Sequence, residues 1–567
     1  MSKLRASISV LTALAIITAA CTSDGERSGS TPISPPPAPV TTTTLAVTTT
    51  TEADPCEEFV FCVLYEIDPD AAWSDGTPVS AADLQHTLDM ITDPVTGAPD
   101  QVGYRLIEEI VPLGDGTVLV GFSEVFAPWR TLFEFVLPAH AEESFGTEGA
   151  PVTGPFVLDE WVEGDRIVLR RNPAYWASSD PVSEAPLGDV EEIVFVFPES
   201  VRDQLQGLES GDIDVIEPRP LEWMIPELES MDDVTYDVVP GEFWEHIDFN
   251  HDDPLLGQDW VREAISLAID REEILDATVR AIDPDAQPLD SAIWMRNSVN
   301  YQDNYDQLHD PEAAESLLKE RFCELAADGV YECQGRRMSF TWATTVGDEY
   351  RNSIFEIVSN SLEQIGIEVV LDQRTPSELF SSNVFFGGPS IWQIISFSWK
   401  GEADPFRANS TFFCTGDAPS GFGTLNVNRY CNPEVESLIR STQTLVDPAA
   451  RHGAYHQADI AYLADDAIVP LFQKPELLAF NSALSGLIPN ISGSTNLWNV
   501  AAWQGQETVV VALDGEPSSL DPLRPDGDSA RVVLTAMLHG LLGVDPSLDF
   551  VPVLVEQAEA RLGGAGK

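Results

Sequence analysis

Apolar and polar residues alternate with period two in some segments of this chain and with helical spacing in others. Residues 154–176 (GPFVLDEWVEGDRIVLRRNPAYW) alternate on both sides of Glu163-Gly164, which predicts two strands joined by a tight turn. Residues 191–216 (EEIVFVFPESVRDQLQGLESGDIDVI) predict a strand, a helix that ends at Gly211, and a second strand. A strand–helix–strand crossover of this kind is typical of α/β folds.

Two further helices are predicted after polar turns. In residues 71–91 a helix begins after Ser80, and Asp83 at its third position completes a capping-box pattern. Residues 243–275 predict a strand, an acidic loop and a helix with one apolar face. The apolar residues of that face are Val261, Ala264, Ile265, Ala268 and Ile269.

The last part of the sequence has the pattern of a new strand–loop–helix unit. Thr508 to Val511 form a β-branched run that predicts a buried strand, and an acidic Gly/Pro-containing loop follows. Residues 531–543 (RVVLTAMLHGLLG) then have helical spacing, with Gly543 as the expected end of the helix. A new strand–loop–helix unit therefore opens in the last part of the sequence.

The first residues predict export. Residues 1–21 have a basic start, a short apolar run and the sequence TAAC, which resembles a bacterial lipobox with Cys21 as the lipidated residue. An ordinary cleaved signal peptide with a chance cysteine is the alternative. Residues 22–55 are rich in Ser, Thr and Pro and contain almost no core-forming residues, which predicts a disordered linker. We expect an extracytoplasmic protein that is anchored to the outer face of the cell membrane, or on its periplasmic side, by a lipid on Cys21.

Composition and cysteine spacing limit the partners and the cellular compartment that fit this protein. The 567 residues carry a formal net charge of −63, which argues against nucleic acid as a partner. The six cysteines after Cys21 fall into three pairs of neighbours, as in an oxidising compartment. Pairing of neighbours is the simplest interpretation, although other connectivities are open. The expected disulfides join Cys56 to Cys62, Cys323 to Cys333, and Cys414 to Cys431.

The usual catalytic and metal-binding motifs do not occur in this sequence. The histidines do not cluster with the cysteines, and the sequence contains no CxxC, HExxH, Walker or GxSxG motif. We therefore expect no metal, no cofactor and no enzymatic activity, with a secreted hydrolase as the rival class.

Several segments, in order, resemble one family. They are WSDGTPVSAADL (73–84), GPFVLDEW (154–161), RRNPAYW (170–176), LESGDIDV (208–215), FN and VREAISLAIDREEI (249–274), and SWKGEADPFRANSTFFC (398–414). Together they resemble the extracytoplasmic solute-binding proteins of the peptide/nickel ABC importers, family 5. In that family a strand like residues 508–512 usually opens the mature chain. The order of segments is therefore cyclically shifted here, which suggests a circular permutant, with a decayed tandem duplication as the alternative.

The resemblance implies an α/β fold of two lobes, the type II periplasmic-binding-protein-like fold, with an extra α+β subdomain on the first lobe. The expected boundaries are 56–182 for the extra subdomain, 183–280 for the first lobe, 281–470 for the second lobe, and 471–567 for a return to the first lobe.

The resemblance also implies a function. We expect a monomeric receptor that captures oligopeptides in a cleft between the lobes and delivers them to the membrane subunits of an ABC permease. An oligosaccharide or a nickel chelate is the alternative solute, and a surface receptor without a transport role is a further alternative.

Four residues are predicted to contact the ligand. In peptide-binding members the Asp of the DP motif pairs with the α-ammonium group of the ligand, and Asp404 occupies that position here; a turn-capping role is the alternative. Trp399 beside Lys400 could present an aromatic face to the ligand, whereas Trp392 and Phe397 fit core packing better. Glu516 and Ser519 lie in a loop that borders the cleft in the family.

Overall fold

The computed structural model describes residues 54–99, 101–141, 145–490, 492 and 497–564, and residues 54–567 form one compact unit. The predictions for Cys21, the signal peptide and most of the linker lie outside the described residues. No helix in the described part of the chain has the length and apolarity needed to cross a bilayer.

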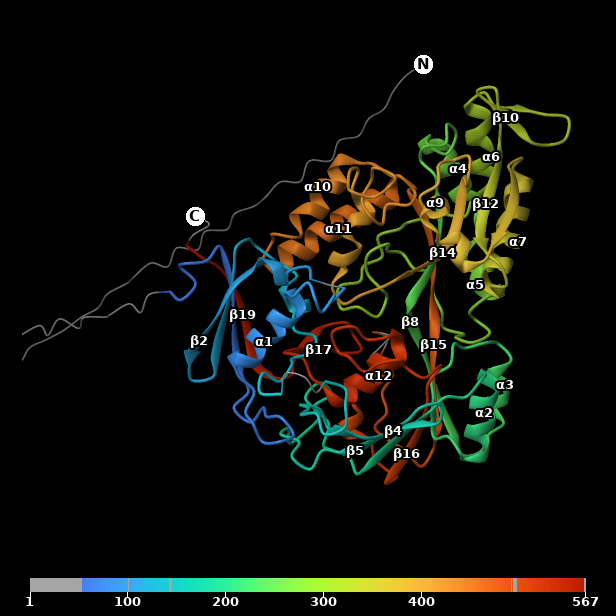
Figure 1. Cartoon of the computed structure of the whole chain (residues 1–567). Coiled ribbons are helices and arrows are strands. Elements are labelled where there is room, and N and C mark those ends of the chain that lie inside the picture. Colours follow the sequence, from blue (N-terminus) through green and yellow to red (C-terminus); the bar gives the residue numbers. More distant parts are fainter. Residues whose placement is uncertain (1–53, 100, 142–144, 491, 493–496, 565–567) are drawn as a thin grey trace, which may run out of the picture. The chain divides into compact units, whose positions relative to one another are not determined.

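One mixed sheet of ten strands forms the framework (Figure 1). Its order is β13 (Glu368–Arg374), β12 (Ser339–Thr345), β14 (Ile394–Lys400), β8 (Val234–Phe249), β15 (Ile468–Asn481), β7 (Val215–Ile216), β16 (Thr508–Ala512), β6 (Glu192–Val196), β5 (Arg166–Arg171) and β4 (Phe156–Val162). A second sheet has the order β19 (Val555–Leu562), β1 (Phe61–Ile67), β3 (Thr117–Phe122) and β2 (Ile107–Gly114). Two small sheets join β11 (Arg336–Arg337), β10 (Tyr331–Cys333) and β9 (Glu324–Leu325), and β17 (Leu542–Val544) with β18 (Phe550–Pro552).

Twelve α-helices and four short 3-10 helices lie in the described chain. The α-helices are α1 (Ala81–Thr92), α2 (Val201–Ser210), α3 (Met224–Glu229), α4 (Asp259–Ala268), α5 (Arg271–Ala277), α6 (Pro311–Glu320), α7 (Glu349–Gln364), α8 (Pro376–Leu379), α9 (Ser382–Phe385), α10 (Pro433–Ser441), α11 (Pro448–Ala464) and α12 (Gly527–Met537). The 3-10 helices are η1 (Tyr104–Leu106), η2 (Trp129–Thr131), η3 (Pro405–Phe412) and η4 (Val500–Ala502).

The structure has two large hydrophobic cores, one for each of the two expected lobes. The first-lobe core joins the four-stranded sheet and α1 to β4, β5, β6, β16 and α12. The second-lobe core joins α4, α5, α6, α7, α10 and α11 to β12 and to parts of β8 and β15. Because α4 and α5 belong to the second-lobe core, the chain changes core within β8, whereas the sequence-based boundary lies at residue 280.

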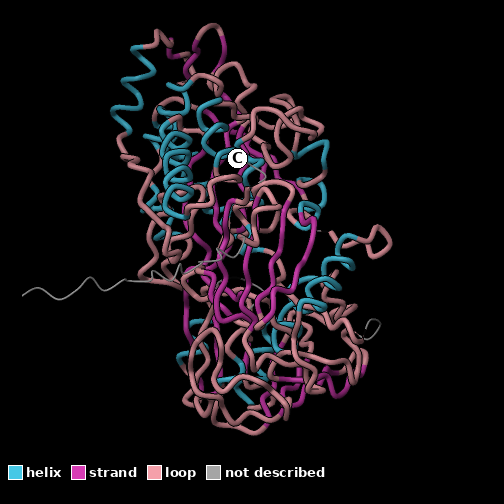
Figure 2. Tube along the Cα trace, turned by 90° about the vertical axis from the view of Figure 1, so that its left-hand side faces the viewer, coloured by secondary structure: helices cyan, strands magenta, loops and turns pink. Residues whose placement is uncertain are grey.

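The two longest strands, β8 and β15, connect the cores. They are antiparallel, and in Figure 2 strands run through the middle of the picture with helices on either side. The first part of β8 pairs with β15 in the first lobe, and its last part pairs with both β15 and β14 in the second. The register shifts between Gln473 and Pro475. We call this crossing, residues 240–243 of β8 and 473–476 of β15, the hinge.

The late strand–loop–helix unit is an internal part of the first lobe. Strand β16 lies between β7 and β6 and runs parallel to both, so it separates the two strands of the crossover predicted in residues 191–216. Val509 and Val511 are buried in the first-lobe core. The β-branched pattern therefore correctly predicted a buried strand.

The predicted end of the following helix was wrong. Helix α12 ends at Met537, and Leu538 is already extended, with φ −127° and ψ 139°. Beyond it the chain bonds to a loop of the first lobe: Leu541 N–H donates to the Phe133 carbonyl at 3.1 Å, and Val136 N–H donates to the His539 carbonyl at 3.2 Å. These tertiary hydrogen bonds take residues 538–543 out of the helix despite their helical spacing.

Other local predictions are confirmed. Ser80 and Asp83 form the expected capping box at α1, and Gly211 ends α2 with φ 78°. The hairpin of β4 and β5 turns at Glu163-Gly164. All three neighbour disulfides are present: Cys56–Cys62, Cys323–Cys333 and Cys414–Cys431.

Candidate functional site

A cavity of about 440 Å³ lies between the two cores, beside the hinge. Arg130 and Arg531 line it from the first lobe, and Asp404 lines it from the second. A second cavity of about 200 Å³ lies against the hinge and is lined by Lys474, Asp528 and Tyr350, among others. Glu242 is a lining residue of both cavities.

The lobes also meet away from the hinge. Ala127 N–H of the first lobe donates to the Gln443 carbonyl at 3.0 Å, and the rings of Phe126 and Phe406 meet edge to face with centroids 5.7 Å apart. The two lobes are therefore in contact at this second place as well as through the hinge strands.

Carboxylates gather at the hinge. Glu242 of β8 is buried; its Oε1 pairs with Lys400 Nζ at 2.9 Å, and its backbone N–H donates to Glu476 Oε1 at 3.1 Å. Glu242 Oε2 is buried without a hydrogen-bond partner in the described structure. Burial raises the pKa of Glu242 to about 8, with Lys400 opposing the shift and Glu476 and Asp528 adding to it. Burial likewise raises the pKa of Glu476 to about 7.

Close approach of the hinge strands depends on a glycine. A Cβ on Gly241 would lie 2.6 Å from the Lys474 carbonyl oxygen and 2.7 Å from Glu476 Oε1. The Gln473 side chain also donates to the Gly241 carbonyl at 2.7 Å. The absence of a side chain at residue 241 thus leaves space for the Lys474 carbonyl and the Glu476 carboxylate beside β8.

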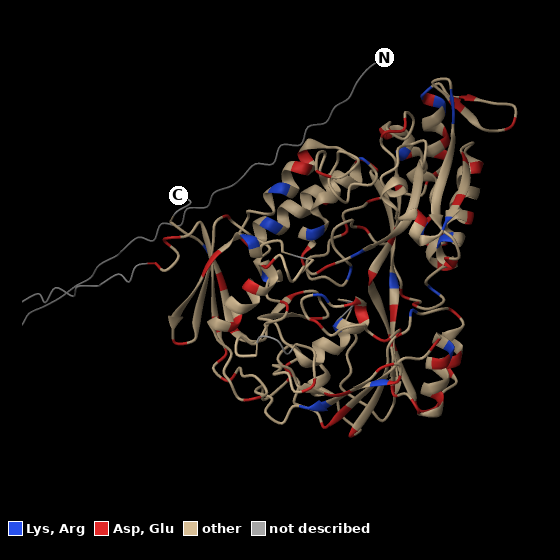
Figure 3. Cartoon of the chain, in the orientation of Figure 1, with Lys and Arg blue, Asp and Glu red and all other residues tan. Residues whose placement is uncertain are grey.

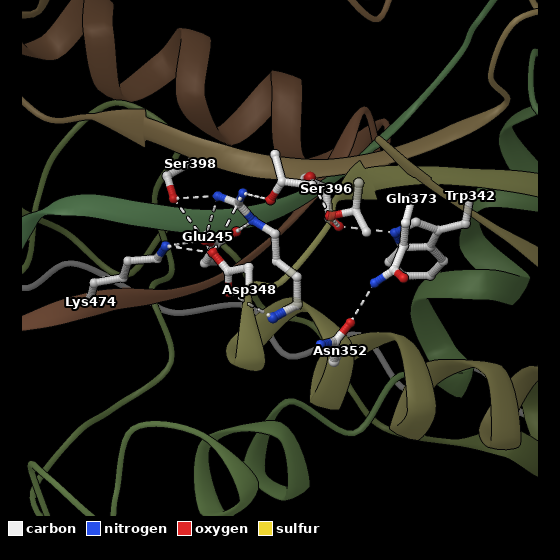
Figure 4. Close-up of polar contacts among 11 residues, drawn as sticks. Glu245, Trp342, Asp348, Asn352, Gln373, Ser396, Ser398 and Lys474 are labelled. Carbon is white, nitrogen blue, oxygen red and sulfur yellow. Dashed lines mark hydrogen bonds and ion pairs between the residues drawn. The ribbon is translucent and has the colours of Figure 1, made fainter. Parts of the chain in front are cut away.

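A second buried carboxylate, Glu245, has hydrogen-bond or ionic partners at both of its oxygens (Figure 4). Arg351 donates to both of its oxygens, at 2.9 and 3.2 Å, and Lys474 Nζ and the Ser398 hydroxyl both reach Oε1, at 2.5 and 2.7 Å. Burial alone would raise the pKa of Glu245, but Lys474 and Arg351 lower it to about 2. This network holds Lys474 at the wall of the smaller cavity.

Asp404, the predicted ammonium ligand, lines the larger cavity but already has a cationic partner. Arg451 of α11 forms a bidentate pair with its two oxygens at 2.6 and 2.7 Å, and both side chains are buried. Asp404 also caps η3, because Oδ1 accepts a hydrogen bond from Phe406 N–H at 3.1 Å. The structure therefore shows the capping contact, and a direct contact of Asp404 with ligand stays a prediction.

Trp399 lies near the larger cavity but belongs to an aromatic cluster. Its ring stacks on His246 with centroids 6.2 Å apart and meets Phe397 edge to face at 4.9 Å. It lines a small space of about 50 Å³ that shares Lys400, Gly401 and Glu402 with the larger cavity. Trp392 and Phe397 are buried, as expected for core residues.

Glu516 and Ser519 line none of these cavities. Glu516 accepts hydrogen bonds from Trp161 Nε1 at 2.8 Å and from Gly164 N–H at 2.9 Å, which fastens the hairpin of β4 and β5 to the loop after β16. Ser519 Oγ accepts from Asp521 N–H at 3.0 Å. In the same loop it is Asp514 that lines the smaller cavity.

Sequence reasoning missed Glu242 and Glu476. Each lies in a long strand beside Gly or Pro, in VVPGEFW and KPELL, where the strand pattern is interrupted. Such an interruption in a long strand indicates a bend, and a carboxylate beside it was the available signal. Pairing of the two segments, however, depends on strands more than 200 residues apart.

The arrangement suits binding of a polar organic solute. The larger cavity has the size of typical small-molecule sites, about 300–1,000 Å³, and carries charged groups of both signs. Among the described residues, no group of three or more His, Cys, Asp or Glu side chains is arranged to hold a metal ion.

Comparison with known proteins places the chain among solute-binding proteins. Residues 63–417 match the model of the bacterial extracellular solute-binding proteins, family 5 Middle. The oligopeptide-binding protein OppA of Mycobacterium tuberculosis (strain H37Rv) is 26% identical over 444 residues, which are 75% of this chain and 71% of that protein.

Solved structures share the fold. The periplasmic EDTA-binding protein EppA superposes with a TM-score of 0.64 at 21% identity, over 79% of this chain and 85% of that one. The oligopeptide-binding protein AppA of Bacillus subtilis, in complex with a nonapeptide, gives a TM-score of 0.54 at 20% identity, over 79% and 87%. The family match covers more than half of the sequence, and the chain belongs to the bacterial extracellular solute-binding proteins of family 5.

Proposed function

We propose that this protein is the solute receptor of an ABC importer and captures oligopeptides in the cavity between its lobes. The observation that carries the proposal is the cavity of about 440 Å³, which is lined by both lobes beside a two-strand hinge. Closure of two lobes about such a hinge encloses a ligand, and opening releases it. The proposed activity is binding and delivery without a chemical step.

Peptide is the first choice of solute for two reasons. The similar proteins OppA and AppA are oligopeptide-binding proteins by name, and the cavity offers both cationic and anionic side chains to the ends of a zwitterion. Arg130 is placed to meet a carboxylate, and the hinge carboxylates are placed to meet an ammonium group.

The proposal includes the partners predicted from sequence. The loaded receptor docks on the membrane subunits of a permease, and a lipid on Cys21 holds it at the outer face of the membrane. The Ser/Thr/Pro-rich residues 22–55 would give the receptor reach from that anchor.

Calorimetric titration with three classes of solute tests the proposal. The purified protein is titrated with a mixed set of tri- to pentapeptides, with an oligosaccharide, and with a nickel–histidine complex. We expect micromolar or tighter binding of peptides and no saturable binding of the other two. Saturable binding of only the oligosaccharide or the nickel complex would remove peptide as the solute and leave the family assignment intact.

A further inference from the structure

We infer that the hinge carboxylates Glu242 and Glu476 bind an ammonium group of the solute. This inference rests on the proposed function of a solute receptor and names the chemistry that its cleft selects. The predicted ammonium ligand, Asp404, is a different residue on the wall of the larger cavity.

The carboxylates at the hinge outnumber the lysine that pairs with them, so this place can accept a further cation. Three carboxylates act on one another there, those of Glu242, Glu476 and Asp528, and Lys400 is the cation that pairs with Glu242. Lys400 satisfies Oε1 of Glu242, whereas Oε2 is buried and without a partner in the described structure. A buried carboxylate oxygen without a donor is unfavourable, and a ligand N–H group in the adjoining cavity would provide one.

The two carboxylates lie at the hinge, where the lobes would move relative to one another. Glu242 is on β8 and Glu476 is on β15, and the backbone N–H of one donates to the side chain of the other at the crossing of these strands. Lys400 is the last residue of β14 in the second lobe, and Asp528 is in the first turn of α12 in the first lobe. A cation bound here would contact groups of both lobes and of the hinge, which favours the closed arrangement.

Asp404 is less suited to receive a cation. Its two oxygens already form a bidentate pair with Arg451, so a second cation would meet a carboxylate whose charge is compensated. Glu242, by contrast, shares one ammonium group with its acidic neighbours.

The ionisation of the hinge carboxylates supports the inference. With pKa values raised to about 8 and about 7, Glu242 is mostly protonated at pH 7 and Glu476 is protonated for about half of the time. A bound cation favours the ionised form, so binding releases protons and weakens as the pH falls through about 8 and then about 7. The other charged or titratable groups that line the two cavities are Arg130, Glu134, Glu217, Arg219, Tyr350, Lys400, Glu402, Asp404, Arg407, Lys474, Asp514, Asp528, Arg531 and His539.

Four pentapeptides of one sequence test the inference. They combine a free or acetylated amino terminus with a central lysine or norleucine, and their affinities are measured by calorimetry at pH 6 and pH 8. We expect at least one charged peptide to bind about tenfold or more tightly than the neutral peptide, since hydrogen bonds between charged partners are stronger than those between neutral ones. Which charge gives the advantage identifies the source of the cation. The advantage of the lysine, which stays protonated at both pH values, should be larger at pH 8, whereas the amino terminus itself loses its proton near pH 8.

Isosteric variants assign the effect to the hinge. In the double variant Glu242→Gln with Glu476→Gln the advantage should fall below about threefold, while Glu209→Gln, an exposed residue of α2, should retain it. If the double variant does not fold, the single variants and the pH dependence of the unchanged protein decide.

Equal affinities for all four peptides would overturn the inference and leave the proposed function standing. A charge advantage that survives in the double variant, or a lysine advantage that does not change with pH, would also overturn it. Binding of none of the four peptides would overturn the inference and the proposed function together.

Discussion

Buried carboxylates in and around the cleft differ in how completely they are compensated. Asp404 has a bidentate arginine, and Glu245 has an arginine, a lysine and a serine hydroxyl. Glu242 pairs with one lysine, and within the described structure its other oxygen has no hydrogen-bond partner. The first two therefore serve to fix the surrounding structure, whereas Glu242 is the carboxylate with capacity for a further contact.

Asp404→Ala should destabilise the protein strongly. Removal of one partner from a buried ion pair leaves Arg451 uncompensated, which costs about 3–5 kcal/mol. Urea unfolding measures the loss, and Asp404→Ala combined with Arg451→Met should recover a large part of it. A single variant within about 1 kcal/mol of the unchanged protein would contradict this structural role.

Glu242 should make stability depend on pH. Its pKa is raised by burial to about 8, so the folded state holds its proton more strongly than the unfolded state does. The stability from that proton is complete below the unfolded pKa of about 4.5 and is lost as the pH rises to about 8. The Glu242→Gln variant should therefore gain stability relative to the unchanged protein between pH 5 and pH 8, in unfolding curves measured at several pH values. A difference that is constant with pH would show that Glu242 is not shifted.

At the scale of elements, sequence patterns correctly predicted those helix ends and strands that depend on interactions between neighbouring residues. The capping box at α1, the glycine end of α2 and the buried strand β16 follow from residues next to each other in sequence. The end of α12 was missed, because hydrogen bonds to residues 133–136, far away in sequence, override the helical spacing. The hinge carboxylates were missed for the same reason, since strand pairing over a long sequence separation brings them together.

Strand β16 should be essential to the first lobe. Val509 is fully buried between neighbouring strands, whereas Thr508 beside it is exposed. Val509→Asn should cost about 2–4 kcal/mol in thermal or urea unfolding, because it places an amide in an apolar core. Thr508→Asn, which introduces the same side chain at the exposed neighbouring residue, should cost less than about 1 kcal/mol. Equal effects of the two variants would argue that β16 does not occupy the sheet.

Two glycines should respond to alanine in opposite directions. Gly453 lies inside α11, and the space that an added methyl group would occupy is open, so Gly453→Ala should stabilise the protein by about 0.5–1 kcal/mol. Gly241→Ala at the hinge should destabilise it by about 1–3 kcal/mol, because the methyl group would collide with β15. Thermal unfolding compares them, and a neutral Gly241→Ala would mean that the hinge strands are less closely apposed than the structure shows.

At the scale of the whole molecule, the segments quoted from the sequence predicted both the family and the two-lobed fold. The match to the family model confirms the predicted family. The full sequence has a net charge of −63, and Asp and Glu are spread over the described chain rather than gathered at one site (Figure 3). Such a field raises the local concentration of cationic solutes. We further propose that circular permutation explains the element order, because β16 enters the centre of the first-lobe sheet from the far end of the sequence.

The most direct test of a solute receptor is its cargo. The protein is purified gently from its own cells, and its mass is measured under native and then denaturing conditions. We predict a native mass that exceeds the denatured mass by that of a bound solute, which fragments as a short peptide. A native protein that repeatedly carries an oligosaccharide, or one that binds no peptide after its cargo has been removed, would contradict the account.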